Sequence, residues 1–181
     1  MMEANEQAID YLVERGRLER ITPRRETAEH LLREARRHLA SAASLAETED
    51  TSMAFVAAYD AARKALSAIL AVQGLRAKGG DGGHAVLLDA VRPQFPDQRR
   101  ELQRFDWMRT VRNNTEYPDF DTPSATKHDV ADAQAAAMPI IALAEAFVGS
   151  HPSDAQVKVW GPSVEIPPPA PASPRRTPFG P

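Results

Sequence analysis

The feature that most constrains the fold of this chain is the spacing of its apolar residues, which recur every three or four positions. In the segment 23–47 this stripe consists of Ala28, Leu31, Leu32, Ala35, Leu39, Ala42 and Leu45. Such a repeat places the side chains on one face of an α-helix. Alternating patterns and long β-branched runs, which are typical of strands, are nearly absent. The chain is therefore expected to be all-α.

Turn and capping residues divide this pattern into segments. The predicted helices cover about 5–16, 23–47, 52–74, 84–91, 97–117 and 123–149. Thr22 and Thr122 each precede a proline, which suits an N-cap followed by proline at the first helical position. Gly16 and Gly74 are expected to end the helices before them. Pro139 is expected to kink or split the last helix, because proline removes a backbone hydrogen bond.

Four long helices joined by mostly short loops predict an up-and-down four-helix bundle with short extra helices. We expect residues 1–22 to form an N-terminal extension with a short helix, and residues 23–149 to form the bundle. Residues 150–181 form a third part, because eight of the fifteen prolines lie after residue 161. This tail is expected to be extended or disordered, since it has too little apolar surface to bury.

Composition excludes several classes of site. The chain contains no cysteine, so it cannot form a disulfide, a thiolate metal site or a catalytic thiol. His30 and His38 are eight residues apart and form no metal-binding signature, and we expect neither a metal nor a cofactor. No apolar run reaches the roughly 18 residues of a membrane span, and the acidic N-terminal segment is unlike a signal peptide. The expected location is the cytoplasm, without a membrane contact.

The most informative polar segment runs from Arg112 to Tyr117, near the end of a predicted helix. Arg112 and Glu116 are four residues apart, as are Asn113 and Tyr117, so the two pairs lie side by side. Arg109 joins this face from one turn earlier. Arginine and asparagine together can hold a phosphate group and orient it. The alternative interpretation is a solvated, salt-bridged helix end.

A second polar cluster lies on the helix predicted over 52–74. Asp60 precedes Lys64 by four residues, a pairing that stabilises a helix by roughly 0.3 kcal/mol. Arg63 lies beside Lys64 and adds a second positive charge. The cluster is either such a stabilising pair or a polar patch in a groove of the bundle that faces Arg112.

In this order and spacing, the motifs resemble the HEPN family of small helical bundles. The resemblance covers about residues 24–149 and rests on the segments Tyr59-Asp60-Ala61-Ala62-Arg63-Lys64-Ala65-Leu66, Gly82-Gly83-His84-Ala85 and Arg109-Thr110-Val111-Arg112-Asn113-Asn114-Thr115-Glu116-Tyr117-Pro118. It implies a metal-independent ribonuclease that acts as a homodimer. It also implies a toxin–antitoxin or defence setting, in which a nucleotidyltransferase-type antitoxin is the partner.

The signature of this family is an arginine, often followed by a polar residue, with a histidine four to six positions later. Arg112 matches the arginine and Asn113 the polar residue, but Tyr117 stands in the window of the histidine, a form that resembles a bacterial branch. Histidine titrates near pH 6.5, whereas tyrosine titrates near pH 10. Tyr117 can thus donate a proton at neutral pH but needs a lowered pKa to accept one.

The leading hypothesis is that the chain binds RNA or nucleotide phosphate, with Arg112 and Tyr117 as the pair that would cleave RNA. The residues expected to bind phosphate are Arg112, Asn113, Arg109, Arg63 and Lys64, supported by Asp60, Glu116 and His84. The alternative is a non-catalytic dimeric interaction module that accompanies a nucleotidyltransferase-type partner. A third reading is that the polar cluster only rigidifies the bundle.

Overall fold

The structure is a computed structural model that describes residues 2–78, 83–116 and 124–151. Within these ranges the chain forms six α-helices and a two-stranded ribbon. In chain order the elements are α1 (Met2–Glu14), β1 (Leu18–Arg20), α2 (Arg25–Ala46), α3 (Thr51–Val72), β2 (Leu75–Ala77), α4 (Gly83–Val91), the 3-10 turns η1 (Arg92–Gln94) and η2 (Pro96–Gln98), α5 (Arg99–Glu116) and α6 (Lys127–Ser150). The predicted all-α class is confirmed.

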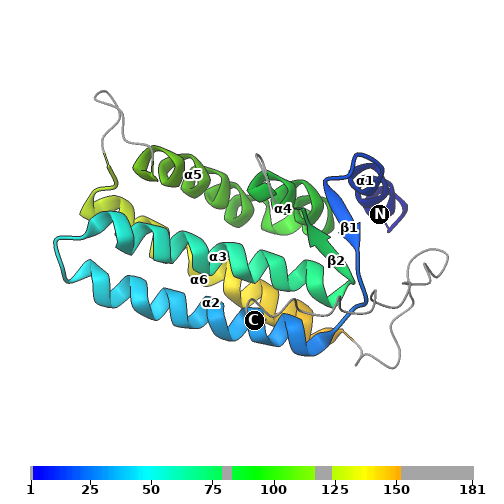
Figure 1. The fold of residues 1–181 in the computed structure, drawn as a ribbon, viewed down its shortest axis with the longest axis horizontal. Helices are drawn as coiled ribbons and strands as arrows, with labels where there is room; N and C mark the ends of the chain where they lie inside the picture. Colours follow the sequence, from blue (N-terminus) through cyan, green and yellow to red (C-terminus); the bar gives the residue numbers. More distant parts are fainter. Residues whose placement is uncertain (1, 79–82, 117–123, 152–181) are drawn as a thin grey trace, which may run out of the picture.

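The four long helices form the predicted up-and-down bundle, in which α2, α3, α5 and α6 alternate in direction (Figure 1). Helix α3 is central, because it packs against α2, α4, α5 and α6, and thirteen of its 22 residues are buried. Many of these are alanines, whose small side chains let α2 and α6 approach closely. The larger buried side chains of α3 include Phe55, Tyr59, Leu66 and Ile69.

The sequence did not predict the antiparallel ribbon, which pairs Leu18 with Ala77 and Arg20 with Leu75. Strands of three residues are too short to show an alternating pattern. Leu18 and Leu75 are 1% and 3% exposed, so each strand buries one leucine in the core. The ribbon therefore fastens the N-terminal extension to the end of α3.

The ribbon also explains why α2 begins later than predicted. The Ile21 backbone N–H donates to the Gly74 carbonyl oxygen at 2.8 Å, which keeps the chain extended up to the segment of Thr22. The helix begins at Arg25 with Arg24 as its N-cap, so the prediction of a cap at Thr22 is wrong. This contact joins segments that are distant in the sequence, so the threonine–proline pair alone could not predict it.

Helix α6 differs from its prediction at two points. Thr122 lies outside the described residues, and the helix begins at Lys127 behind a capping box formed by Thr126 and Asp129. Pro139 lies inside the uninterrupted helix, so it does not split the helix, and a kink, the other effect expected of this proline, stays a prediction. Pro139 is exposed, while its neighbours Ile140 and Ile141 are buried. Burial of this kind offsets the roughly 3 kcal/mol that a proline costs inside a helix.

By length and apolar composition alone, α6 would suffice to cross a membrane. The helix packs against α2, α3 and α5, and its buried residues include Ala133, Ala137, Ile140 and Ala144. Core helices of soluble domains pass the same test, so α6 is weak evidence for a membrane span.

Gly74 provides a test of the ribbon. Its φ is +73°, and an added Cβ would lie 2.7 Å from the Ile21 carbonyl oxygen. We expect Gly74→Ala to lower the free energy of unfolding by about 2–4 kcal/mol, because the left-handed conformation costs roughly 1–2 kcal/mol and overpacking adds about 1–3 kcal/mol. Urea unfolding monitored by circular dichroism measures the change.

Gly16 is the matched control, since its φ is +66° but an added Cβ would meet no atom within 4 Å. Gly16→Ala should show only the conformational cost of roughly 1–2 kcal/mol. Equal losses for the two variants would contradict the close approach between Gly74 and Ile21.

Candidate functional site

The polar clusters of α3 and α5 come together around Tyr59. This side chain is 1% exposed, and its ring stacks on Phe105 of α5 with centroids 5.2 Å apart and planes 14° apart. The guanidinium carbon of Arg112 lies 5.9 Å from the centroid of the same ring, a distance typical of a cation–π contact. Two segments about fifty residues apart in the sequence thus form one site.

Several charged side chains act on the phenol of Tyr59. Burial raises the pKa of the Tyr59 phenol to about 12, although the charges of Arg112, Arg63 and Arg109 act to lower it. The phenol therefore stays protonated at neutral pH. Three guanidinium groups act on one buried ring, so this face is locally basic in a chain whose net charge is −3.

Asp60 lies next to Tyr59 on α3 and joins two helices. Its Oδ1 accepts from Arg63 Nε at 2.7 Å, and its Oδ2 lies 3.3 Å from Nδ1 of His38 on α2. Burial by itself would raise the pKa of Asp60, but the Arg63 hydrogen bond and the charges of Arg63, His38 and Lys64 outweigh it, so the pKa is lowered. Asp60 is thus a carboxylate that holds Arg63 in place.

The hydrogen bond of Asp60 to Arg63 differs from the pairing with Lys64 that the sequence suggested. Arg63 is three residues away and bonds directly, whereas Lys64 is half-buried and acts on Asp60 through its charge. Both positive side chains lie on α3, one turn after Tyr59.

On α5, each arginine of the motif has a neighbour that orients it. Arg109 donates to Asp106 Oδ1 through Nε at 3.2 Å and Nη2 at 3.0 Å. Arg112 is half-buried and donates through Nη1 to Asn113 Oδ1 at 3.4 Å. Asn113 itself is exposed. Both guanidinium groups are therefore oriented before any ligand arrives.

Three predicted residues cannot be placed in this site. Tyr117 lies outside the described residues, as do the side chains of Glu116 at the end of α5 and His84 at the start of α4. The Arg112–Glu116 and Asn113–Tyr117 pairs suggested by the sequence therefore remain predictions.

His38 is the residue of this site that sequence reasoning considered only as a metal ligand. It stands three residues after Ala35 and four before Ala42, within the apolar stripe of α2, and its side chain is 30% exposed. A polar residue at a core-facing position was the available signal. Among the described residues, no three His, Cys, Asp or Glu side chains gather as a metal site would require.

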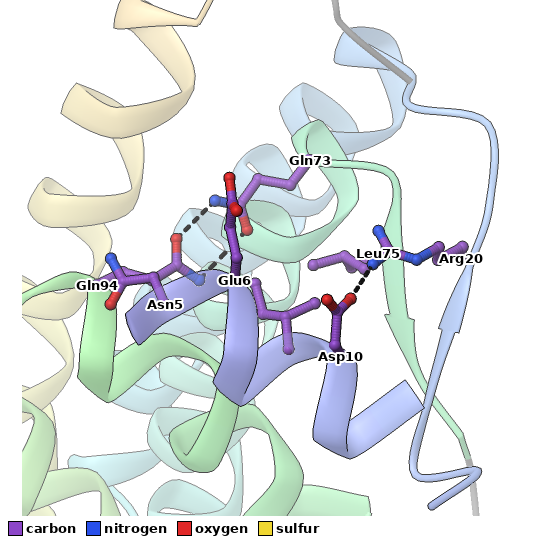
Figure 2. A pocket seen from close by; sticks show the side chains of 8 residues that line it. Asn5, Glu6, Asp10, Arg20, Gln73, Leu75 and Gln94 are labelled. Carbon is purple, nitrogen blue, oxygen red and sulfur yellow. Dashed lines mark hydrogen bonds and ion pairs between the residues drawn. The ribbon is translucent and has the colours of Figure 1, made fainter. Parts of the chain in front are cut away.

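A separate pocket of about 160 Å³ lies where α1 meets the ribbon, at the opposite end of the bundle from the C-terminal end of α5 (Figures 1 and 2). Its polar groups mostly bond one another, as Figure 2 shows. Gln73 Nε2 donates to Gln94 Oε1 at 2.6 Å, and Arg20 pairs with Asp10 at 2.5 Å. The Arg20–Asp10 pair fastens α1 to β1, and the Gln73–Gln94 bond joins the end of α3 to η1.

Comparison with protein families agrees with this fold. The family model of the HEPN domain matches residues 28–147, about two thirds of the chain. The chain belongs to the HEPN domain family. Searches of the curated proteins and of the solved structures found no match. The family points to a ribonuclease or nucleotide-related function in general, and its members commonly dimerise and bind RNA.

The lowered pKa of Asp60 makes a prediction about stability. A carboxyl group whose pKa is lowered by folding stabilises the folded state at pH values above its pKa in the unfolded chain, which is 3.8. This stabilisation is lost as the pH falls through the pKa of the folded state. We expect Asp60→Asn to destabilise the protein by about 1–3 kcal/mol at pH 7, the scale of a hydrogen bond to a charged group, and by less at pH 3.

Urea unfolding of wild type and Asp60→Asn at pH 7 and pH 3 measures this difference. Asp97→Asn, at an exposed position in η2, is the matched control for loss of one carboxylate. A destabilisation of the Asp60 variant that is the same at both pH values would show that ionised Asp60 does not stabilise the fold.

Proposed function

We propose that the chain binds the phosphate groups of RNA or of nucleotides at the face shared by α3 and α5, with Arg112 and Asn113 as the central ligands. The observation that carries the proposal is the position of Arg112 over the Tyr59 ring, where the charges of Arg63 and Arg109 also converge. Family membership supports a phosphate-containing ligand.

The chemistry of this face suits a phosphodiester. A guanidinium group presents its donors in a planar fork that matches two phosphate oxygens. Arg112 lies over the Tyr59 ring, while Asp60 and Asp106 hold Arg63 and Arg109 through hydrogen bonds. Positioning before binding lowers the entropy that each side chain loses when it meets the ligand.

Two neighbouring side chains complete the proposed surface. Exposed Asn113 adds an amide that can bond a phosphate or a ribose hydroxyl. Lys64 adds a positive charge without a fixed direction, as a flexible ammonium group does. RNA would thus contact the face mainly through its backbone.

We further propose that bound RNA is cleaved without a metal, in a toxin–antitoxin or defence setting in the cytoplasm, by a homodimer with a nucleotidyltransferase-type antitoxin as its partner. In this proposal Arg112 neutralises the charge that develops on the phosphate. Tyr117, a protonated phenol at neutral pH, donates a proton to the leaving oxygen.

Arg112→Ala tests the binding proposal. We expect the affinity for a labelled single-stranded RNA to fall by about 10- to 100-fold, which corresponds to loss of one charge-assisted hydrogen bond of roughly 1.5–3 kcal/mol. The plot of log affinity against log salt concentration should also become less steep, by about the amount that corresponds to one phosphate contact. Fluorescence anisotropy at several salt concentrations measures both quantities.

Arg104→Ala is the matched control, because Arg104 also lies on α5 but donates to the Asp132 carbonyl of α6 at 3.1 Å. This variant also removes one positive charge, but at a position away from Tyr59, and it should change RNA affinity far less. Equal losses in the two variants would mean that only the net charge matters and would contradict a site at Arg112.

The alternative functions predict other results in the same experiment. A wild-type protein that binds neither RNA nor nucleotides would overturn the binding proposal and favour a non-catalytic dimeric module that accompanies a nucleotidyltransferase-type partner. A lower melting temperature for Arg112→Ala with unchanged RNA affinity would favour a role of the polar cluster in rigidity alone.

A further inference from the structure

Another face of the bundle has a groove that the phosphate site does not use. The groove has a volume of about 500 Å³ and lies between α2 and α6. It shares no residue with the site around Tyr59, so an inference drawn from it does not depend on phosphate binding. Six of its eight lining residues are apolar, namely Leu39, Ala40, Ala43, Met138, Ile141 and Ala142.

Met138 leaves much of its apolar surface uncovered in this groove. It is 59% exposed, and Ala40, Ala43 and Ala142, which line the same groove, are exposed as well. Alanines leave room for a larger side chain above them. A methionine side chain is flexible and polarisable, and its sulfur makes favourable contacts with aromatic rings. The lining therefore suits an aromatic side chain.

An ion pair between α2 and α6 marks one end of the groove. Arg36 Nη2 donates to Glu145 Oε2 at 2.8 Å, and Arg36 Nε donates to Glu145 Oε1. The two helices run in opposite directions (Figure 1). Ala43, about two turns after Arg36, is therefore level with Met138, about two turns before Glu145.

The chain leaves α6 beside the start of α2. Arg25 Nη1 donates to the His151 carbonyl oxygen at 2.8 Å, and His151 has extended backbone angles, with φ −75° and ψ 138°. Glu145 and Met138 lie six and thirteen residues before His151. At about 1.5 Å per helical residue, the groove therefore runs from roughly 9 to roughly 20 Å back along the helix axis.

The first strongly apolar segment after α6 is long enough to reach this groove. Residues 152–181 lie outside the described residues, but their sequence continues from His151 with five residues and then Val157-Lys158-Val159-Trp160. An extended chain advances about 3.1 Å per residue. Trp160 stands nine residues after His151, which gives a reach of roughly 28 Å. Met138 is roughly 20 Å away, so enough length remains for the chain to reverse its direction.

We propose that Val157 and Trp160 of this chain dock in the groove between α2 and α6, with the Trp160 ring against Met138. In an extended chain with about three residues per turn, these two side chains lie on the same side, while Lys158 turns to the solvent. A tryptophan buries about 150–250 Å² of surface, enough to cover the exposed part of Met138.

Proximity and size favour the chain's own tail over a separate partner. The tail starts at His151, near the Arg36–Glu145 end of the groove. A segment on a short flexible tether acts at an effective concentration of roughly the millimolar range. Stable interfaces between two proteins usually bury about 1,200–2,000 Å², more than a groove of eight lining residues provides. One aromatic anchor on a short tether suits its size.

Methyl NMR of the full chain, labelled at the methionine methyl carbons, tests the contact. Trp160→Ala removes the ring, so we expect the Met138 methyl signal to move, because an aromatic ring shifts the resonances of groups packed against it. Met138→Leu assigns this signal. Met53 is the matched control, since it is 51% exposed on α3, and its signal should stay in place.

A mixing experiment distinguishes the chain's own tail from the tail of a second copy. Labelled Trp160→Ala protein is mixed with an excess of unlabelled wild type, whose tail carries the tryptophan. If each tail docks on its own bundle, the Met138 signal of the labelled chain stays at the position of the variant.

Fluorescence measures the same docking from the side of Trp160. The chain contains two tryptophans, so Trp107→Phe leaves Trp160 as the reporter. We expect acrylamide to quench Trp160 severalfold less in this variant than after addition of Ala43→Lys, because the lysine places a charge level with Met138. Ser44→Lys is the matched control at an exposed position of α2 outside the groove lining, and it should leave quenching low. Circular dichroism shows that each variant is folded.

Four results would overturn the proposal. A Met138 signal that Trp160→Ala leaves unchanged, or that moves together with the signal of Met53, would mean that the ring does not lie in the groove. Quenching of Trp160 that Ala43→Lys does not change would place the ring elsewhere. Return of the Met138 signal on mixing would assign the groove to the tail of a second copy. All four results leave the role of Arg112 to be tested by RNA binding.

Discussion

The stacking of Tyr59 on Phe105 is the interaction on which the rest of the site depends. Helix α5 packs on α3 through large aromatic side chains rather than alanines, and Phe55 meets Trp107 edge-on, with centroids 5.8 Å apart, in the same interface. Aromatic pairs of this kind are worth about 0.5–1.5 kcal/mol beyond the area they bury. They set the register of α5, and this register places Arg112 over the Tyr59 ring.

The charges of this site are half-buried, and most of them lie beside a partner, because removing a charge from water without one is costly. Asp60 lies between His38 and Arg63, and Asp106 holds Arg109. The acids offset part of the arginine charge and orient the guanidinium groups. What remains is a surface that is basic at one place on an acidic chain, with its donors already directed.

The departures from the sequence predictions share one cause. Each predicted cap or break was judged from neighbouring residues, whereas contacts distant in the sequence decided the outcome. The Gly74 carbonyl oxygen accepts a hydrogen bond from the Ile21 N–H, so α2 begins later than predicted. Burial of α6 against α2 and α3 keeps the helix continuous through Pro139. The ribbon exists because the end of α3 offers Leu18 a buried position.

The sequence by itself determined the all-α class, the four long helices and the family, because helical periodicity and the order of short motifs are local properties of the chain. It also indicated that the segments around Asp60 and Arg112 are polar clusters, although it left open whether these clusters lie in contact. Only the tertiary structure decided that they do, around Tyr59, and that His38 joins them from α2. No spacing along the chain encodes that meeting, because it depends on the packing of three helices.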